Sequence, residues 1–120
     1  MCSSFDPRGF LRLADRLLND TKYEKEARIR TTISRAYYAA FLSAMKKLQE
    51  LGCSFRDVHR LHRDVIEMLS SRNGGLGSKL NSLFDHRVDA DYKVEANVTH
   101  LGDKCCRLSE HIINSLEAVH

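Results

Sequence analysis

One long amphipathic stretch, from Ala27 to Leu51, constrains the fold more than any other feature of this chain. Apolar side chains recur along it every three or four residues, which is the period of one face of a helix. Its centre is the run Arg35-Ala-Tyr-Tyr-Ala-Ala-Phe41. Small residues let a neighbouring helix come close, and tyrosine joins an apolar ring to a polar hydroxyl. The stretch therefore predicts a long helix in a tightly packed bundle with a polar seam.

Local signals divide the rest of the chain into further helices. Asp6-Pro7 suits the start of a first helix, and Thr21 with Glu24 fits a capping box at the start of the central one. Ser54 suits the start of a third helix, with Val58 on its buried stripe, and Ser70–Gly75 is typical of a loop. The expected helices cover 6–20, 21–52, 54–69, a short segment from 76 that fades at 87–91, and 94–119.

These elements predict an all-α, antiparallel bundle of about five helices, two of them long. The chain has one proline and six glycines, and no segment alternates with the period of a strand. Its 120 residues form a single domain by the usual relation of length to domain number, spanning 1–120. The two long helices, over 21–52 and 94–119, are expected to be the central pair.

Charge and cysteine usage bear on location and partners. Residues 1–63 carry thirteen Lys/Arg and seven Asp/Glu, whereas residues 64–120 carry six and nine, so the halves have net charges of +6 and −3. The basic half could attract an anion, or the two halves could neutralise each other. The segment Met1–Pro7 lacks the features of a signal peptide, and no apolar run reaches bilayer length. We expect a cytoplasmic protein, not bound to membrane, whose four cysteines, Cys2, Cys53, Cys105 and Cys106, are free.

Three local patterns can be compared with known kinds of ligand site, and only the first fits one. Arg56, Arg60 and Arg63 have helical spacing beside His59, which fits either a phosphate-binding stripe or a solvated helix face. His59 and His62 could share a metal, but two histidines without a further ligand pair do not make a zinc pattern, so no metal and no cofactor are expected. The glycines of 74–79 do not match a phosphate loop, which needs Gly-Lys-Ser/Thr after a strand.

A polar seam is expected where the central helix meets the segment Arg87-Val-Asp-Ala-Asp-Tyr92. Arginine is costly to bury without a partner, and the aspartates of this segment could supply one. The seam is either a structural set of ion pairs or a groove that meets the phosphate of a nucleotide or RNA. Its candidate binding residues are Arg35, Tyr38, Arg87, Asp91 and Tyr92.

Three segments together resemble the HEPN domain family, in its small single-domain prokaryotic members. They are Arg30-Thr-Thr-Ile-Ser-Arg35-Ala-Tyr-Tyr-Ala-Ala-Phe41, then His62 shortly before Val65-Ile66, then Arg87–Tyr92. The resemblance spans nearly the whole chain and implies a bundle of about five helices that forms a homodimer. It also implies a minimal nucleotidyltransferase as partner, often in a toxin–antitoxin couple. Many members are metal-independent ribonucleases, whose signature pairs an arginine with a histidine a few residues later.

The ribonuclease signature is incomplete in this sequence. Carried onto Arg87, it would place the histidine at residues 92–94, which are Tyr92, Lys93 and Val94. Tyrosine is a poor general base at neutral pH because its pKa is far higher than that of histidine. The spacing from Arg56 to His62 does fit, but it precedes the place where the family carries its motif.

Three functional hypotheses follow. In the first, the protein binds RNA or a nucleotide and works with a nucleotidyltransferase, with Arg87 and Arg35 on phosphate and Asp91 orienting an arginine. Tyr92 then contributes a hydroxyl or is modified by the partner. In the second, it is an active ribonuclease toxin that combines Arg87 with His62 or His86. In the third, it is a non-catalytic helical interaction module.

Overall fold

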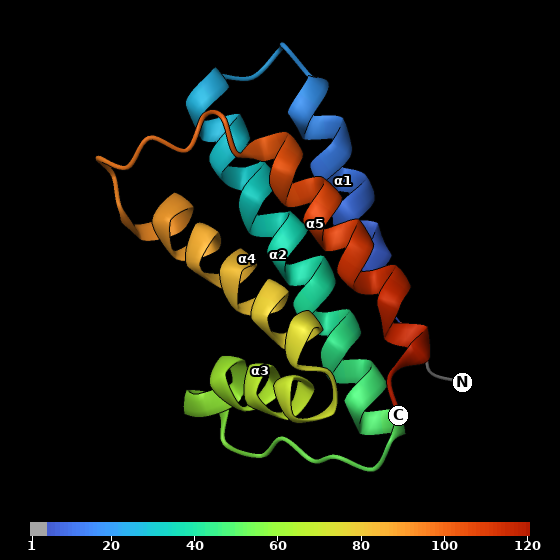
Figure 1. Ribbon diagram of the computed structural model, residues 1–120. Coiled ribbons are helices and arrows are strands. Elements are labelled where there is room, and N and C mark those ends of the chain that lie inside the picture. The colour runs from blue at the N-terminus through green and yellow to red at the C-terminus, as the bar shows by residue number, and fades with distance from the viewer. Residues whose placement is uncertain (1–4) are drawn as a thin grey trace.

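The computed structural model describes residues 5–120, which fold into five α-helices and two short 3-10 turns without any strand (Figure 1). Helices α1, α2, α4 and α5 run alternately up and down, and α3 lies across one end of the bundle. The predicted all-α bundle is thus confirmed. No helix within 5–120 combines the length and apolarity needed to cross a bilayer. The α-helices are α1 (Arg8–Asn19), α2 (Lys25–Glu50), α3 (Leu61–Arg72), α4 (Gly74–Tyr92) and α5 (Gly102–Ser115).

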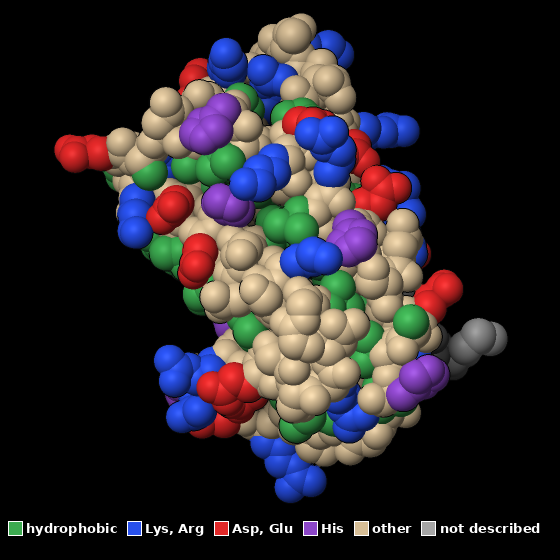
Figure 2. Space-filling view, in the orientation of Figure 1, with side chains coloured by type: hydrophobic (Ala, Val, Ile, Leu, Met, Phe, Trp, Pro, Cys, Tyr) green, Lys and Arg blue, Asp and Glu red, His purple; other side chains and the backbone are tan. Residues whose placement is uncertain are grey.

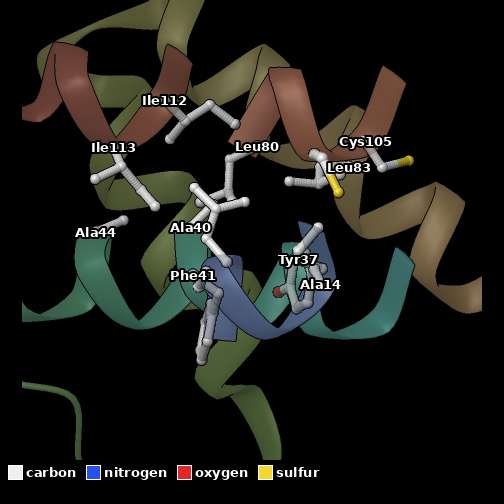
Figure 3. Close-up of a cluster of buried hydrophobic side chains, with 14 of the residues drawn as sticks. Ala14, Tyr37, Ala40, Phe41, Ala44, Leu80, Leu83, Cys105, Ile112 and Ile113 are labelled. Atoms are coloured by element: carbon white, nitrogen blue, oxygen red, sulfur yellow. The ribbon is translucent and has the colours of Figure 1, made fainter. Parts of the chain in front are cut away.

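Helix α2 is the centre of the molecule and contacts all four other α-helices. Its alanines at 36, 39, 40 and 44 are fully buried, so neighbouring backbones come close to it. Burial of each large apolar side chain contributes about 1.5–3 kcal/mol, and most of this core surrounds α2. Figure 3 shows the centre of the core, where side chains of α1, α2, α4 and α5 meet, among them Ala14, Tyr37, Phe41, Leu80, Leu83, Cys105 and Ile112.

The two ends of α2 differ in how well the sequence predicted them. The capping box at Thr21 is wrong, because the cap is the Glu24 carboxylate, which accepts hydrogen bonds of 2.8 Å from the N–H groups of Glu26 and Ala27. These bonds lower the pKa of Glu24. The stop at Gly52 is correct: its φ of 98° suits glycine, and the Cys53 N–H donates to the Leu48 carbonyl at 2.9 Å.

The start of the third helix lies later than predicted. Residues 53–57 are not helical, and a 3-10 turn, Val58–Arg60, precedes α3. Asp57 caps this turn by accepting a hydrogen bond from the His59 N–H at 3.0 Å, so Ser54 is not the cap. Val58 is 75% exposed and does not belong to the buried stripe. The prediction that Arg56, Arg60 and Arg63 lie on one helix face is also wrong, because Arg56 precedes the 3-10 turn and Arg60 belongs to it.

The glycine-rich segment is part of a helix and not a loop. Asn73 alone separates α3 from α4, and its side-chain oxygen accepts a hydrogen bond from the Leu76 N–H at 3.0 Å. A Cβ at Gly77 would lie 2.6 Å from the Ser70 Cα, so glycine is needed for the close crossing of the two helices. The fourth helix is therefore long, and it includes the segment Arg87–Asp91 where it was expected to fade.

The last helix is shorter than predicted. The segment from Lys93 to Leu101 has no helix, and α5 is followed by a 3-10 turn, Leu116–Ala118. Val94 is 86% exposed, although the apolar period placed it on the buried face. Helix α5 does pack against α2, but α4 is the second longest helix of the bundle.

The cysteines within the described residues are free, as expected. Cys105 and Cys106 are buried and Cys53 is half-buried, whereas Cys2 lies outside the described residues. Burial raises the pKa of the Cys105 and Cys106 thiols to about 12, so both remain protonated and unreactive at neutral pH.

Candidate functional site

The end of α4 is fastened to α2 by the side chain of Arg30. The last carbonyls of a helix have no partner within it, and an arginine fork can satisfy several of them. The Arg30 guanidinium donates hydrogen bonds of 2.8–3.2 Å to five backbone carbonyls, those of Asp89, Ala90, Lys93, Val94 and Ala96. Arg30 is thus a structural clamp that holds the segment Arg87–Tyr92 beside the polar side of α2. Its partners there are backbone carbonyls and not the aspartates that were expected to pair with a buried arginine.

A buried aromatic cluster lies under this junction. Tyr37 is fully buried, and its hydroxyl is hydrogen-bonded to Nδ1 of His62 at 2.6 Å. The His62 ring also stacks on Phe41, with the ring centroids 4.4 Å apart. Burial raises the pKa of Tyr37, so its hydroxyl stays protonated. The pKa of His62 is lowered, first by burial and then by the charge of Arg87, so His62 is neutral at neutral pH.

Arg87 is the charged group at the centre of the site, and it is only 6% exposed. Its guanidinium carbon lies 5.2–5.7 Å from four ring centroids, at distances typical of cation–π contacts. These rings are Tyr37, Tyr38, Phe84 and Tyr92. Its ion pair with Asp91 has an N–O distance of 3.6 Å, and its buried Nε has no hydrogen-bond partner in the described part of the chain. The guanidinium is thus held by aromatic rings more than by hydrogen bonds.

The predicted seam forms a connected set of side chains. Ser34 donates a hydrogen bond to Asp91 at 3.2 Å and accepts one from Arg35 at 3.2 Å. The Arg35 guanidinium lies 4.9 Å from the ring centroids of both Phe10 and Tyr38. The structure therefore brings Arg35, Tyr38, Arg87 and Asp91 together.

Tyr92 lies at the edge of the seam, at the last position of α4. Its side chain is 71% exposed, although its ring contacts the Arg87 guanidinium. The ring therefore covers one side of the charge while most of the residue remains open to solvent. This combination would let the hydroxyl meet a second molecule without any change in the fold.

An open pocket lies on the other side of Arg87, between α3 and α4. Its volume is about 390 Å³, and its lining consists of His59, Arg60, His62, Arg63, Phe84 and Arg87. None of these carries a carboxylate, although Arg60 makes a partly exposed ion pair with Asp64 at 3.5 Å. We call this the cationic pocket. Positive and negative side chains are interspersed on the face of the molecule in Figure 2, so that face is not uniformly basic.

Of the two histidines proposed beside Arg87, only His62 lines the cationic pocket. His86, also on α4, does not line this pocket and lies near Lys104 and His100 instead. Burial and the charges of these two residues lower the pKa of His86. Sequence reasoning named His62 but not its bond to Tyr37, because these residues belong to different helices. Within residues 5–120, no three His, Cys, Asp or Glu side chains gather into a group that could hold a metal ion.

Comparison with known proteins gives no match: no protein-family model matches the chain, and no curated protein or solved structure does so. The functional argument therefore depends on the geometry of the seam and the cationic pocket. Arg60 of the 3-10 turn, Arg63 of α3 and the buried Arg87 of α4 face a common hollow, while the adjacent rings exclude water from Arg87. Such an arrangement can bind an anion and can place a neutral imidazole beside it.

Proposed function

We propose that this protein is a HEPN-like binder of RNA or nucleotide phosphate, with the cationic pocket as the phosphate site. The observation that supports this most directly is the lining of the pocket, which brings three arginines and two histidines together without a carboxylate. Arginine presents a planar fork of donors that matches phosphate oxygens. Arg60 and Arg63 would supply the exposed contacts, and Arg87 a buried positive charge below them.

The burial of Arg87 favours an anionic ligand on physical grounds. A charge removed from water needs compensation, and the 3.6 Å ion pair with Asp91 supplies only part of it. A phosphate in the pocket would complete the neutralisation in a region of low dielectric, where the attraction is stronger than at an open surface. Arg35 and Tyr38, on the Asp91 side, would extend the contact toward a neighbouring part of an RNA.

The resemblance to the HEPN family supplies the wider proposal. The protein would act in the cytoplasm as a homodimer, together with a minimal nucleotidyltransferase in a toxin–antitoxin type of system. Tyr92 would contribute its hydroxyl to the ligand or accept a group from the partner. Its 71% exposure at the end of α4 is consistent with either role.

A metal-independent ribonuclease is the second candidate, favoured by the position of His62. His62 and Arg87 line the same pocket, although the incomplete signature after Arg87 gave no histidine. Because Nδ1 accepts the hydrogen bond of Tyr37, the neutral His62 imidazole carries its proton on Nε2 and can donate a hydrogen bond to an oxygen of the reacting phosphate. A nearby guanidinium can stabilise the negative charge that develops on the phosphate. The lowered pKa of His62 keeps the ring neutral, so Nε2 acts as a hydrogen-bond donor and not as a general base.

Binding and cleavage can be measured on one labelled RNA. We would titrate a fluorescein-labelled single-stranded RNA in EDTA, follow anisotropy, and analyse the same samples on a gel. Arg63→Ala removes an exposed charge from the pocket, and Arg107→Ala removes one from α5, where Arg107 pairs with Asp103 at 2.7 Å. We expect Arg63→Ala to weaken binding about tenfold, equivalent to about 1.4 kcal/mol, and Arg107→Ala less than about twofold.

The same experiment separates the hypotheses. Equal loss in the two variants would mean that binding depends on net charge and not on the pocket. Absence of binding by the wild type would refute the proposal and favour the non-catalytic interaction module. Cleavage by the wild type that disappears in His62→Asn, with binding retained, would establish the ribonuclease.

A further inference from the structure

A second hollow adjoins the cationic pocket in the groove between α3 and α4. Its lining residues are Arg63, Ile66, Glu67, Asn81 and Phe84, and its volume is about 390 Å³. Arg63 and Phe84 line both hollows, so the two form one groove that runs along the helix pair. Each volume lies near the lower limit of about 300 Å³ for small-molecule sites, so together they offer room for a larger ligand than either alone.

The chemistry of the groove changes from one end to the other. The cationic pocket has arginines and histidines without a carboxylate, whereas the second hollow keeps only Arg63 of these and adds Ile66, Glu67 and Asn81. Glu67 and Asn81 are exposed, so their polar atoms are available to a ligand. The carboxylate of Glu67 would repel a phosphate from the second hollow. A ligand with an anionic end and a neutral ring would therefore bind in one orientation only.

We propose that the groove holds one nucleotide unit, with its phosphate in the cationic pocket and an amino-bearing base in the second hollow. Ile66 and Phe84 present apolar surface on which the flat face of a base can pack, and such packing is possible for every base. The Asn81 amide can donate and accept hydrogen bonds at an adenine edge, and the Glu67 carboxylate can accept one from an exocyclic amino group. Adenine and cytosine carry that group, whereas hypoxanthine and uracil do not.

This inference rests on the proposed phosphate site, and three small probes separate the two. We would measure dissociation constants for AMP, IMP and ribose 5-phosphate by isothermal titration calorimetry. The proposal predicts that AMP binds at least about tenfold more tightly than ribose 5-phosphate, with IMP between them, where tenfold corresponds to about 1.4 kcal/mol. It also predicts that AMP, but not ribose 5-phosphate, shifts the NMR signal of the Ile66 methyl groups.

Substitution of two exposed residues tests which end of the groove binds the phosphate and which binds the base. Asn81→Ala should weaken AMP about fivefold and leave ribose 5-phosphate unchanged, whereas Arg63→Ala should weaken both ligands by similar factors. Equal affinity for AMP and ribose 5-phosphate would overturn the base site while the phosphate site stands. Equal affinity for AMP and IMP would overturn the recognition of an amino group. No binding of any probe would refute the phosphate site and this inference together.

Discussion

Removal of the Tyr37 hydroxyl tests the buried centre of the site. In Tyr37→Phe the ring keeps its contacts with Phe41 and Phe84, so the change is confined to the 2.6 Å bond to Nδ1 of His62. A neutral hydrogen bond contributes about 1 kcal/mol, and an acceptor left partly buried without a partner adds up to about 1 kcal/mol more. We therefore expect a loss of about 1–2 kcal/mol in the free energy of unfolding.

The loss can be measured by urea denaturation and by thermal melting, both followed by circular dichroism. With an unfolding entropy of about 2.1 cal/mol/K per residue, a chain of 120 residues loses about 4 °C of Tm for each kcal/mol. The expected decrease in Tm is thus about 4–8 °C. The dependence of the unfolding free energy on urea should stay constant, because the substitution exposes no new surface.

A double-mutant cycle isolates the hydrogen bond from other effects. His62→Phe leaves the fully buried Tyr37 hydroxyl without its acceptor, whereas the double variant removes both polar groups and should recover much of the loss. The expected coupling energy is about 1–2 kcal/mol. A Tyr37→Phe variant within about 0.3 kcal/mol of the wild type, with no coupling, would refute the reasoning, because the hydroxyl would then not be held in a desolvated bond.

Three further perturbations address the elements that position the site. Arg30→Ala should lower the unfolding free energy by about 2–3 kcal/mol in urea titrations, and Arg30→Lys should recover less than half, because an ammonium cannot reach five carbonyls. Gly77→Ala should lose about 1–3 kcal/mol by the same measurement, whereas Gly75→Ala, whose Cβ would make only an ordinary contact of 3.7 Å with the Asn73 side-chain oxygen, should be neutral or slightly stabilising. By NMR titration, His62 should have a pKa below 6.5, and Arg87→Met should raise it.

The sign of the pH effect follows from the lowered pKa of His62 in the folded state. Below about pH 6.5 the unfolded chain binds a proton that the folded chain does not, so His62 contributes stability that is complete above this pH and decreases as the pH falls toward the folded pKa. Arg87→Met should make this decrease smaller. An unchanged His62 titration in Arg87→Met, or equal stability of Gly77→Ala and Gly75→Ala, would contradict the packing described for these residues.

Local sequence signals located the elements better than they located their ends. The apolar period of α2 extends over many turns, so it predicted the longest helix and its stop at Gly52 correctly. The same reasoning extended the last helix back to Val94, since a period alone cannot show that a loop residue, such as the buried Val98, fills the next position. The segment Ser70–Gly75 was assigned to a loop because the sequence does not show that two helices cross beside it, at Gly77.

The sequence by itself determined the helical class, the central position of the Arg35–Phe41 run and the pairing of that run with Arg87–Tyr92. The first two follow from the spacing of apolar side chains along each helix, and the third follows from the need of a buried arginine for a partner. Only the tertiary structure decided that His62 meets Tyr37, that Arg30 holds the end of α4, and that Arg63 and Phe84 join two hollows into one groove. Such contacts depend on the distances and angles at which helices pack, and these are set by the whole core and not by any one segment.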